Sequence, residues 1–260
     1  MNVIVCIKQV PSGSLPLDDT GILDRSRGSS QLNPGDFSAL EAGLQIGEQT
    51  GGRVTAVTMG PKSAEAALRT AYGLGADRGI LLCDPAFAGA DVYATAYTLS
   101  QGISGIKDWD VILCGQQSTD GDTAQLPFSL ARQLNIPALG WVKKLEVNND
   151  GLQVSQELSD GTQTVKISGP CLLAVGKEAV QVRSPSLRCQ LQARSREIMT
   201  MGLADLKDRD PGHYGQAGSC TQVIQVKNIT KKRKNTPQVL SGPEGAARLI
   251  RLCREVTDHG

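Results

Sequence analysis

The segment with the clearest potential for chemistry runs from residue 115 to residue 125. Its sequence is Gly115-Gln116-Gln117-Ser118-Thr119-Asp120-Gly121-Asp122-Thr123-Ala124-Gln125. A short apolar stretch precedes this loop, and a predicted helix follows it directly. Backbone N–H groups at the start of a helix attract anions, and the serine and threonine side chains add hydroxyl donors. The composition of the loop therefore favours phosphate binding.

Two carboxylates in this loop, Asp120 and Asp122, are less suited to an anion. Asp122 is well placed to cap the following helix, because aspartate accepts hydrogen bonds from the first backbone N–H groups of a helix. Asp120 is free to turn toward a ribose or toward the backbone. From the residues alone, the loop is either a nucleotide site or a well-capped turn.

Standard nucleotide and catalytic fingerprints are absent from the sequence. The phosphate-loop pattern Gly-x-x-x-x-Gly-Lys-Ser/Thr does not occur, and the glycines at 73 and 75 lack the third glycine of the dinucleotide pattern and end a helix. His213 and His259 are the only histidines, too few for a histidine-rich metal site, and both are expected in solvent. No Ser/His/Asp arrangement is apparent. We therefore expect no catalytic side chain and no metal site.

The seven cysteines are scattered along the chain, and none forms a Cys-x-x-Cys pair. This argues against a zinc or iron–sulfur site and favours a reducing cytoplasm. Cys6 and Cys114 end predicted strands, and we interpret them as packing or ligand-contact residues rather than nucleophiles. The basic run at 231–234 is interpreted as a solvated or partner-facing stretch.

Charge and composition narrow the class of protein. The 260 residues carry 27 Lys+Arg against 26 Asp+Glu, and this balance argues against nucleic acid as the main partner. Aromatic residues are only 3%, too few for a platform that stacks the bases of single strands. No apolar run approaches the roughly 20 residues that cross a bilayer, and no signal peptide is recognised. The sequence therefore predicts a cytoplasmic protein without membrane insertion.

The first half of the chain predicts alternating strands and helices. The predicted strands are 3–7, 54–59, 80–83 and 111–114, and the predicted helices are 36–48, 63–74, 91–101 and 123–134. Asp91 is the expected N-cap of the third helix. This order predicts an α/β fold with a doubly wound, mainly parallel, Rossmann-like sheet. Ligands bind such sheets beyond the carboxyl ends of the strands, where the 115–125 loop lies.

The pattern changes after Pro137. Segments 141–147, 152–158 and 162–167 alternate polar and apolar residues, which predicts an antiparallel β extension, and 171–175 is a further buried strand.

Residues 178–242 show little periodicity, and we interpret them as an extended arm on another surface, with short strands near 223–226. A final helix is expected over 243–256. The predicted organisation is an α/β nucleotide-binding domain over 1–177, a partner-recognition loop over 178–196, and a C-terminal arm with the final helix over 197–260.

Five features in order resemble the beta subunit of electron transfer flavoproteins. They are Val3-Ile4-Val5-Cys6-Ile7-Lys8-Gln9-Val10-Pro11; Leu32-Asn33-Pro34-Gly35-Asp36 with Ala39-Leu40-Glu41; the second crossover at 57–61 and 71–78; the loop at 115–125; and Ser184-Pro185-Ser186-Leu187-Arg188. The resemblance extends from the N-terminus to about residue 196, and more weakly to the end.

The resemblance implies a subunit that pairs with a flavin-carrying alpha subunit and wraps it with a C-terminal arm. The family's nucleotide site holds AMP in simple carriers and a second FAD in bifurcating members, and the form of residues 120–125 resembles the bifurcating kind. NADH would reach the flavin at the same site. By this likeness the nucleotide is lined by Cys6, Asn33, Asp36, Met59, Gly115, Gln116, Asp120, Gly121, Asp122, Thr123, Ala124 and Gln125.

The resemblance also concerns Arg183, Leu187 and Arg188. Arg183 is either near the isoalloxazine ring, where its charge would stabilise a reduced anionic flavin, or in a surface ion pair. Leu187 and Arg188 begin the loop that grips an acyl-CoA or other dehydrogenase. The sequence departs from the family at 126–128 and 181–184, so the helix after the nucleotide loop and the identity of the dehydrogenase are left open.

Three functions follow from these observations. The leading hypothesis is an electron-transfer subunit that binds FAD and, with its alpha subunit, bifurcates the electrons of NADH. The second is a simple carrier subunit that holds a structural AMP. The third is a stand-alone nucleotide-binding regulatory protein.

Overall fold

The computed structural model describes residues 1–12, 30–148, 150–222 and 242–257. The chain divides into two compact units, residues 1–225 and residues 226–260, and each is described by itself.

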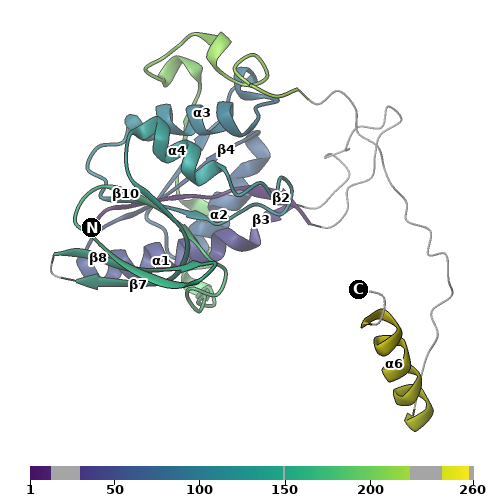
Figure 1. The fold of residues 1–260 in the computed structure, drawn as a ribbon. Helices are drawn as coiled ribbons and strands as arrows, with labels where there is room; N and C mark the ends of the chain where they lie inside the picture. Colours follow the sequence, from purple (N-terminus) through teal and green to yellow (C-terminus); the bar gives the residue numbers. More distant parts are fainter. Residues whose placement is uncertain (13–29, 149, 223–241, 258–260) are drawn as a thin grey trace. The chain divides into compact units, whose positions relative to one another are not determined.

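A nine-stranded sheet forms the centre of the first unit (Figure 1). Its strands lie in the order β11-β5-β4-β1-β6-β10-β7-β8-β9. Their bounds are β1 Val3–Cys6, β4 Val54–Met59, β5 Arg78–Leu82, β6 Val111–Gly115, β7 Ala138–Asn148, β8 Gly151–Leu158, β9 Gly161–Ile167, β10 Cys171–Val175 and β11 Met199–Met201. Neighbours from β11 to β7 are parallel, whereas β7, β8 and β9 are antiparallel. A small separate sheet pairs β2 (Gln9–Pro11) with β3 (Ser30–Leu32). The predicted mainly parallel α/β fold with an antiparallel extension is confirmed.

Helices cover both faces of the sheet, and Figure 1 shows α3 and α4 on one side and α1 on the other. The bounds are α1 Pro34–Thr50, α2 Glu65–Leu74, α3 Val92–Ser104 and α4 Leu126–Leu134. Side chains alternate along a strand, so β1 serves two cores. Val5 packs in one core with Leu40 of α1, and Ile4 packs in the other with Leu99 of α3.

Local sequence signals explain most of the helix ends. The Asp91 side chain accepts a hydrogen bond from Ala94 N at 2.9 Å, so the predicted cap of α3 is confirmed. Helix α1 ends at Gly51, whose left-handed φ of 68° suits glycine, and the Gly51 N–H donates to the Gly47 carbonyl. Helix α4 ends at Asn135, also left-handed, with a φ of 54°.

The prediction was wrong about where α4 begins. The helix was expected from Thr123 but starts at Leu126, with Gln125 as the residue before it. Asp122 and Ala124 have left-handed φ angles of 49° and 53°, and such a backbone cannot be part of a right-handed helix. Pro127 then occupies the first turn, where a missing N–H is tolerated.

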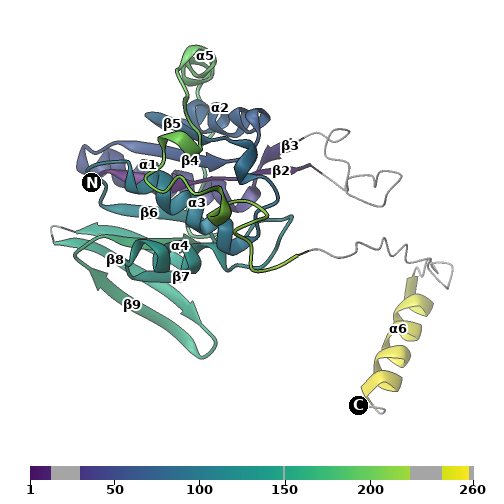
Figure 2. The ribbon, with the colours of Figure 1, turned by 90° about the horizontal axis from the view of Figure 1, so that it is seen from above.

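The interpretation of 178–242 as an arm on another surface was wrong for much of its length, because the segment packs on its own domain. The residues predicted as a recognition loop form a helix, α5 (Leu187–Ser195), which packs against α2 (Figure 2). Strand β11 then pairs in parallel with β5, which would otherwise expose unpaired backbone groups at the sheet edge. Leu206 and Tyr214 are 2% and 0% exposed and belong to the core that contains Leu99. These anchors are single apolar residues between turns, so they leave no periodic pattern. The strands expected near 223–226 lie outside the described residues.

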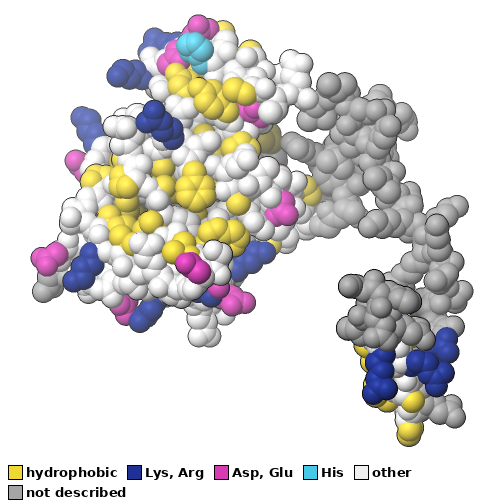
Figure 3. Space-filling model, viewed as in Figure 1, with side chains coloured by type: hydrophobic (Ala, Val, Ile, Leu, Met, Phe, Trp, Pro, Cys, Tyr) yellow, Lys and Arg dark blue, Asp and Glu magenta, His cyan; other side chains and the backbone are white. Residues whose placement is uncertain are grey.

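The second unit contains α6 (Gly242–Thr257), which agrees with the helix expected over 243–256. Leu249, Ile250 and Leu252 are large apolar residues exposed on it, and Arg248 and Arg251 lie between them in the sequence. Figure 3 shows these basic and apolar side chains together on the helix. In the described part of the chain, none of the helices has the length and apolar character needed to cross a membrane.

Candidate functional site

The carboxyl ends of β1 and β6 meet where the strand order reverses. From β1 the chain builds β4 and β5 on one side, and β6 then returns to the other side of β1. This switch point is where open parallel sheets bind ligands. Lys8 follows β1, Gly115 ends β6, and the start of α1 brings Asn33 and Asp36 to the same place.

The Asp36 carboxylate joins three of these segments. Its Oδ2 accepts a hydrogen bond from the Lys8 N–H at 2.7 Å, and its Oδ1 accepts one from Asn33 Nδ2 at 2.8 Å. Burial raises the pKa of Asp36 to about 7, against the opposing effect of hydrogen bonds from Asn33 and from the Lys8 and Gly115 backbones. Asp36 is therefore a buried carboxyl group that titrates near neutral pH while it holds the strand ends together.

Asn33 fixes the first turn of the 115–125 loop. Its Nδ2 also donates to the Gln117 carbonyl at 3.1 Å, and its Oδ1 accepts the Thr119 N–H at 3.2 Å. The Asn33 N–H itself donates to the Lys8 carbonyl at 2.8 Å. One asparagine thus orders the loop relative to both β1 and α1.

Two glycines allow the end of β6 to touch the start of α1. A Cβ on Gly115 would lie 2.3 Å from Asp36 Oδ1 and 2.8 Å from the Gly35 carbonyl carbon. A Cβ on Gly35 would lie 3.1 Å from the Gln117 carbonyl oxygen. The backbones approach closely here, so residue 115 has to be glycine.

Lys8 neutralises Asp120 and thereby removes one objection to an anion site. The Lys8 Nζ lies 2.8 Å from the Asp120 carboxylate, which also accepts the Gly121 N–H at 2.8 Å. Although burial raises the pKa of Asp120, hydrogen bonds from Lys8 and Ser118 bring it below its ordinary value. Asp120 thus faces Lys8 and its own loop. The sequence does not predict Lys8 as a site residue, although its position just after the first strand places it at the ligand-binding edge of the sheet.

Asp122 does not cap α4, and that expectation was wrong. Its backbone is left-handed, and its N–H donates to the Ser118 carbonyl at 2.9 Å. Between this turn and α4, the N–H groups of Thr123, Ala124 and Gln125 have no acceptor among the described residues. Free N–H groups at a helix start, exposed at Thr123 and Gln125, fit a phosphate group.

Gln116 connects the loop to the β7 strand. Its N–H donates to the Val175 carbonyl at 3.1 Å, and its side-chain Oε1 accepts the Trp141 N–H at 2.7 Å. The side chain is buried, and its Nε2 has no hydrogen-bond partner. In the described residues, the only other buried side-chain polar atom without a partner is Thr58 Oγ1, on β4.

Cys6, Cys114 and Met59 lie at the same edge of the sheet. Cys6 and Cys114 are directly paired across β1 and β6. The hydrogen bond that the Cys114 thiol donates to Cys6, together with burial, raises the pKa of the Cys114 thiol well above its usual range. A thiol of this kind is a poor nucleophile, which agrees with a packing role. Met59 ends β4, two residues after the partner of Cys6.

Comparisons with known proteins identify the family. The family model described as electron transfer flavoprotein domain matches residues 20–206. A chain named electron transfer flavoprotein subunit beta, from Thermoanaerobacterium thermosaccharolyticum, is 40% identical over 235 residues, which cover 90% of both chains. The chain belongs to the electron transfer flavoprotein beta-subunit family.

Two further relatives of this family are named as parts of reductase complexes. The acryloyl-CoA reductase electron transfer subunit gamma of Anaerotignum propionicum is 34% identical over 252 residues, or 94% of both chains. The caffeyl-CoA reductase-Etf complex subunit CarD of Acetobacterium woodii is 37% identical over 228 residues, or 86% of this chain and 87% of the relative.

Arg183 forms an ion pair rather than joining the loop network. Its guanidinium lies 2.7 Å from Glu41 and 2.5 Å from Glu48, both on α1. Burial alone would raise the pKa of Glu41, but the hydrogen bonds from Arg183 and Gln45 bring it below its ordinary value. Helical rise places Glu48 about 18 Å along α1 from Asp36. Of the two roles expected for Arg183, the structure shows the ion pair, and a position near the isoalloxazine ring stays a prediction.

Part of the segment predicted to recognise a partner is helical. Ser186 caps α5 by accepting the Cys189 N–H at 3.1 Å. Leu187 and Leu191 are 73% and 57% exposed, and their spacing places them on one side of the helix. Arg188 is exposed beside them. The sequence signal for this helix was weak because α5 buries only one residue, Ala193.

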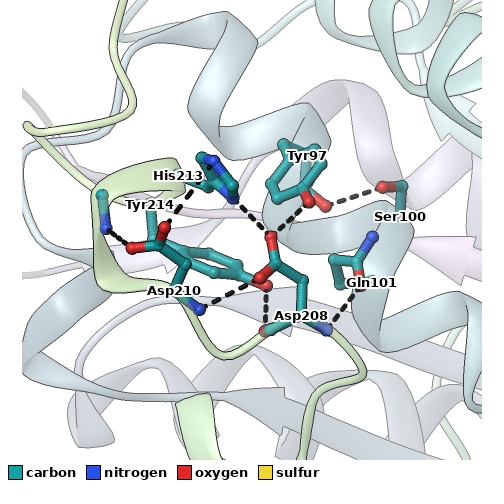
Figure 4. A network of polar contacts seen from close by, with 8 residues as sticks. Tyr97, Ser100, Gln101, Asp208, Asp210, His213 and Tyr214 are labelled. Carbon is teal, nitrogen blue, oxygen red and sulfur yellow. Dashed lines mark hydrogen bonds and ion pairs between the residues drawn. The ribbon is translucent and has the colours of Figure 1, made fainter.

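A second cluster of titratable side chains lies away from the loop (Figure 4). The Asp208 Oδ2 accepts the Tyr97 hydroxyl at 2.6 Å and lies 2.6 Å from His213 Nδ1. The Tyr214 hydroxyl donates to the Asp208 carbonyl. Hydrogen bonds from Tyr97 and His213 lower the pKa of Asp208 to about 2, and Asp208 raises the pKa of His213. This cluster attaches the segment after β11 to α3. Within the described ranges, no group of His, Cys, Asp or Glu is arranged to hold a metal ion.

Proposed function

We propose that this chain binds FAD at the 115–125 loop and, paired with a flavin-carrying alpha subunit, passes electrons from NADH to a partner dehydrogenase by electron bifurcation. The observation that carries the proposal is the junction between the loop and α4. There, three consecutive N–H groups have no acceptor among the described residues, and Lys8 pairs with Asp120 in the same loop. The relatives named for acryloyl-CoA reductase and caffeyl-CoA reductase complexes support an acyl-CoA-linked partner.

The residues present fit the adenosine diphosphate part of such a cofactor. Thr123, Ala124 and Gln125 would donate backbone hydrogen bonds to the pyrophosphate, and the left-handed turn at Asp122 keeps those donors out of the helix. Lys8 would offset the negative charge of Asp120 beside the phosphates. Asn33 and Asp36 would hold the loop in its binding shape.

The chain's own side chains would position the cofactor and not take part in acid, base or nucleophilic chemistry. When bound, FAD supplies the redox chemistry, and the protein sets its position and its electrostatic surroundings. The buried thiols of Cys6 and Cys114 would shape the floor of the site. The 115–125 loop and the alpha subunit together would exclude solvent from the site.

The main alternative is a structural AMP in the same loop. AMP offers one phosphate to the donors at 123–125, whereas FAD offers two and extends further from the loop. A stand-alone nucleotide-binding regulator is the third possibility. A long segment without pattern argues against an autonomous domain, and the sequence shows such a segment after Glu178. Because residues 187–216 pack on the domain, this argument now rests on the residues from 226 onward.

Two surfaces would bind the protein partners. The basic and apolar helix α6 would lie on the alpha subunit, and α5, with Leu187, Arg188 and Leu191, would meet the dehydrogenase. The assembly would work in the cytoplasm.

The test is the identity and amount of nucleotide that denaturation releases from the purified heterodimer. FAD from the beta site supports the proposal, whereas AMP with a single flavin supports the simple carrier. Thr123→Trp should remove about one flavin per heterodimer by blocking the donors at the helix start. Thr162→Trp, on the exposed edge strand β9, is the matched control and should keep full flavin. Unchanged flavin in a folded Thr123→Trp complex would refute the site.

A further inference from the structure

Two half-exposed aromatic side chains lie beside the 115–125 loop. Trp141 on β7 is 52% exposed, and Phe128 in the first turn of α4 is 42% exposed. Apolar side chains gather on the face of the domain that carries α4, β10 and β7 (Figure 3). Large rings are usually withdrawn from water, so an exposed pair next to a ligand site indicates a surface that something covers.

Strand register places Trp141 at the ligand-binding edge of the sheet. Gly115 of β6 pairs with Val175 of β10, and Val175 pairs with Val142 of β7. Trp141 therefore directly precedes Val142, which lies in register with Val175 and Gly115 across the three strands. The bond between Trp141 N and Gln116 Oε1 confirms that the two residues are adjacent.

The backbone of Trp141 is in an unusual conformation. Its φ is 52°, a left-handed value that bulky side chains rarely adopt, and it occurs inside a strand. The hydrogen bond that its N–H donates to Gln116 Oε1 holds this residue in place, and the β7 register shifts between Leu139 and Val142 and again between Val142 and Lys144. Strained backbone that the surroundings enforce is a feature of binding sites, because it aims a side chain in a direction that regular structure would not.

Phe128 reaches the same point from the other side. A Cβ on Gly140 would lie 2.6 Å from Phe128 Cζ, so the phenyl ring rests on the backbone just before Trp141. Phe128 is three residues after Gln125, the last residue of the phosphate-suited junction. The Phe128 ring and residue 141 therefore lie close together near the start of α4.

The Gln116 amide supplies a polar group at this position. Only its oxygen can accept the Trp141 N–H, so the orientation of the amide is determined. Its Nε2 then points away from that bond and has no partner among the described residues, although Gln116 is only 5% exposed. A buried donor without an acceptor is unfavourable, and an acceptor on a ligand would relieve it.

The geometry points to Trp141 and Phe128 as a stacking surface for a planar heterocyclic ring of the nucleotide bound at the loop, with Gln116 donating to an acceptor on the edge of that ring. This inference rests on the proposed function, because it needs a nucleotide in the loop. Indole and phenyl faces stack on planar heterocycles, and the interaction tolerates different rings.

The experiment compares Trp141→Leu with Trp141→Phe in the full chain co-purified with its alpha subunit. Stripped complexes are titrated with FAD and, separately, with AMP. Losing the aromatic face should weaken FAD binding roughly 5- to 100-fold in the leucine variant, whereas phenylalanine should restore most of the affinity. Trp109→Phe is the control, because Trp109 lies before β6, at the opposite edge of the sheet.

A fluorescence measurement keeps the test valid if the leucine variant fails to fold. A ring stacked on Trp141 quenches its emission, so removing FAD should raise tryptophan emission in wild type and in Trp109→Phe, but clearly less in Trp141→Phe. Equal FAD affinity in wild type and Trp141→Leu would overturn the stacking inference and leave the proposed function intact. Loss of the alpha subunit from Trp141→Leu at unchanged FAD affinity would also overturn it, because the aromatic face would then bind protein. If wild type bound no nucleotide at all, both the inference and the proposed function would fail.

Discussion

Gly115→Ala should damage the candidate site more than any other single-methyl change in it. The new Cβ would lie 2.3 Å from Asp36 Oδ1, 2.8 Å from the Gly35 carbonyl carbon and 3.0 Å from Asp36 N. Two of these atoms are backbone, and the third belongs to a carboxylate that Lys8 and Asn33 hold in place. No flexible side chain is available to move aside, so β6 and α1 have to separate.

The size of the effect follows from two contributions. Forcing an extra carbon into a packed region costs about 1–3 kcal/mol. Displacing Asp36 weakens its hydrogen bonds, each of which contributes about 0.5–1.5 kcal/mol when the carboxyl group is neutral and about 1.5–3 kcal/mol when it is charged. We therefore expect a loss of at least about 2 kcal/mol in the free energy of unfolding, which for a chain of this size is a drop of about 4 °C or more in Tm. The 115–125 loop should move with Asp36, and nucleotide content should fall in parallel.

Gly169→Ala is the matched control, because Gly169 lies between β9 and β10, before the start of β10 and away from the 115–125 loop. Its Cβ would meet nothing within 4 Å, and residue 169 is exposed. Both variants are made in the full chain, purified with the alpha subunit, and compared by thermal unfolding and by nucleotide released per complex. If Gly115→Ala unfolds within about 1 °C of Gly169→Ala and retains the same nucleotide, then the close approach of β6 and α1 is not structurally important.

Three further predictions concern regions outside the loop. Arg183→Ala should lower the free energy of unfolding by about 3 kcal/mol, because it leaves Glu41, which is 4% exposed, as a buried carboxylate without its partner; this is the low end for such a loss, since Arg183 itself is 31% exposed. Glu48→Ala removes a carboxylate that is 59% exposed and should cost less than about 1 kcal/mol. Both losses are measured by denaturant titration, and equal losses would contradict the pairing. Asp208 raises the pKa of His213, so the stabilisation from their pair is complete below the unfolded pKa of about 6.5 and is lost as pH rises through the higher pKa of the folded state. His213→Ala should therefore flatten the curve of Tm against pH in that range, and an unchanged curve would exclude the pair. Amide exchange over α6 should slow when the alpha subunit is added, whereas equal exchange with and without it would place the alpha-subunit contact elsewhere.

Much of the fold could be predicted because buried parallel strands leave a strong local signal. The strands at 54–59 and 171–175 have the bounds that were predicted, since each is a short apolar run between turn residues. The antiparallel β extension was equally clear from its alternating polar and apolar residues and its Asp-Gly turns. The order of these elements was sufficient to predict the sheet and therefore the edge at which the 115–125 loop lies.

Contacts between distant residues could not be predicted in this way. Lys8 and Asp120 are 112 residues apart, and Arg183 and Glu41 are 142 apart, so no local pattern relates them. The start of α4 also depended on the tertiary structure, because Asn33 and the close approach at Gly115 hold the loop in a shape that continues past Thr123. Helix-capping preferences alone predicted that Asp122 caps α4, which the structure contradicts.

The sequence by itself determined the α/β class, the antiparallel extension, the switch-point loop and the family, because each depends on the types and order of neighbouring residues. Only the tertiary structure decided that the segment around β11 and Tyr214 belongs to the domain, that Arg183 is paired on α1, and that Trp141 stands beside Gln116. The physical reason is that hydrogen bonds and burial act over a few ångströms in space. Residues far apart in the chain become partners only when the sheet has brought their strands together.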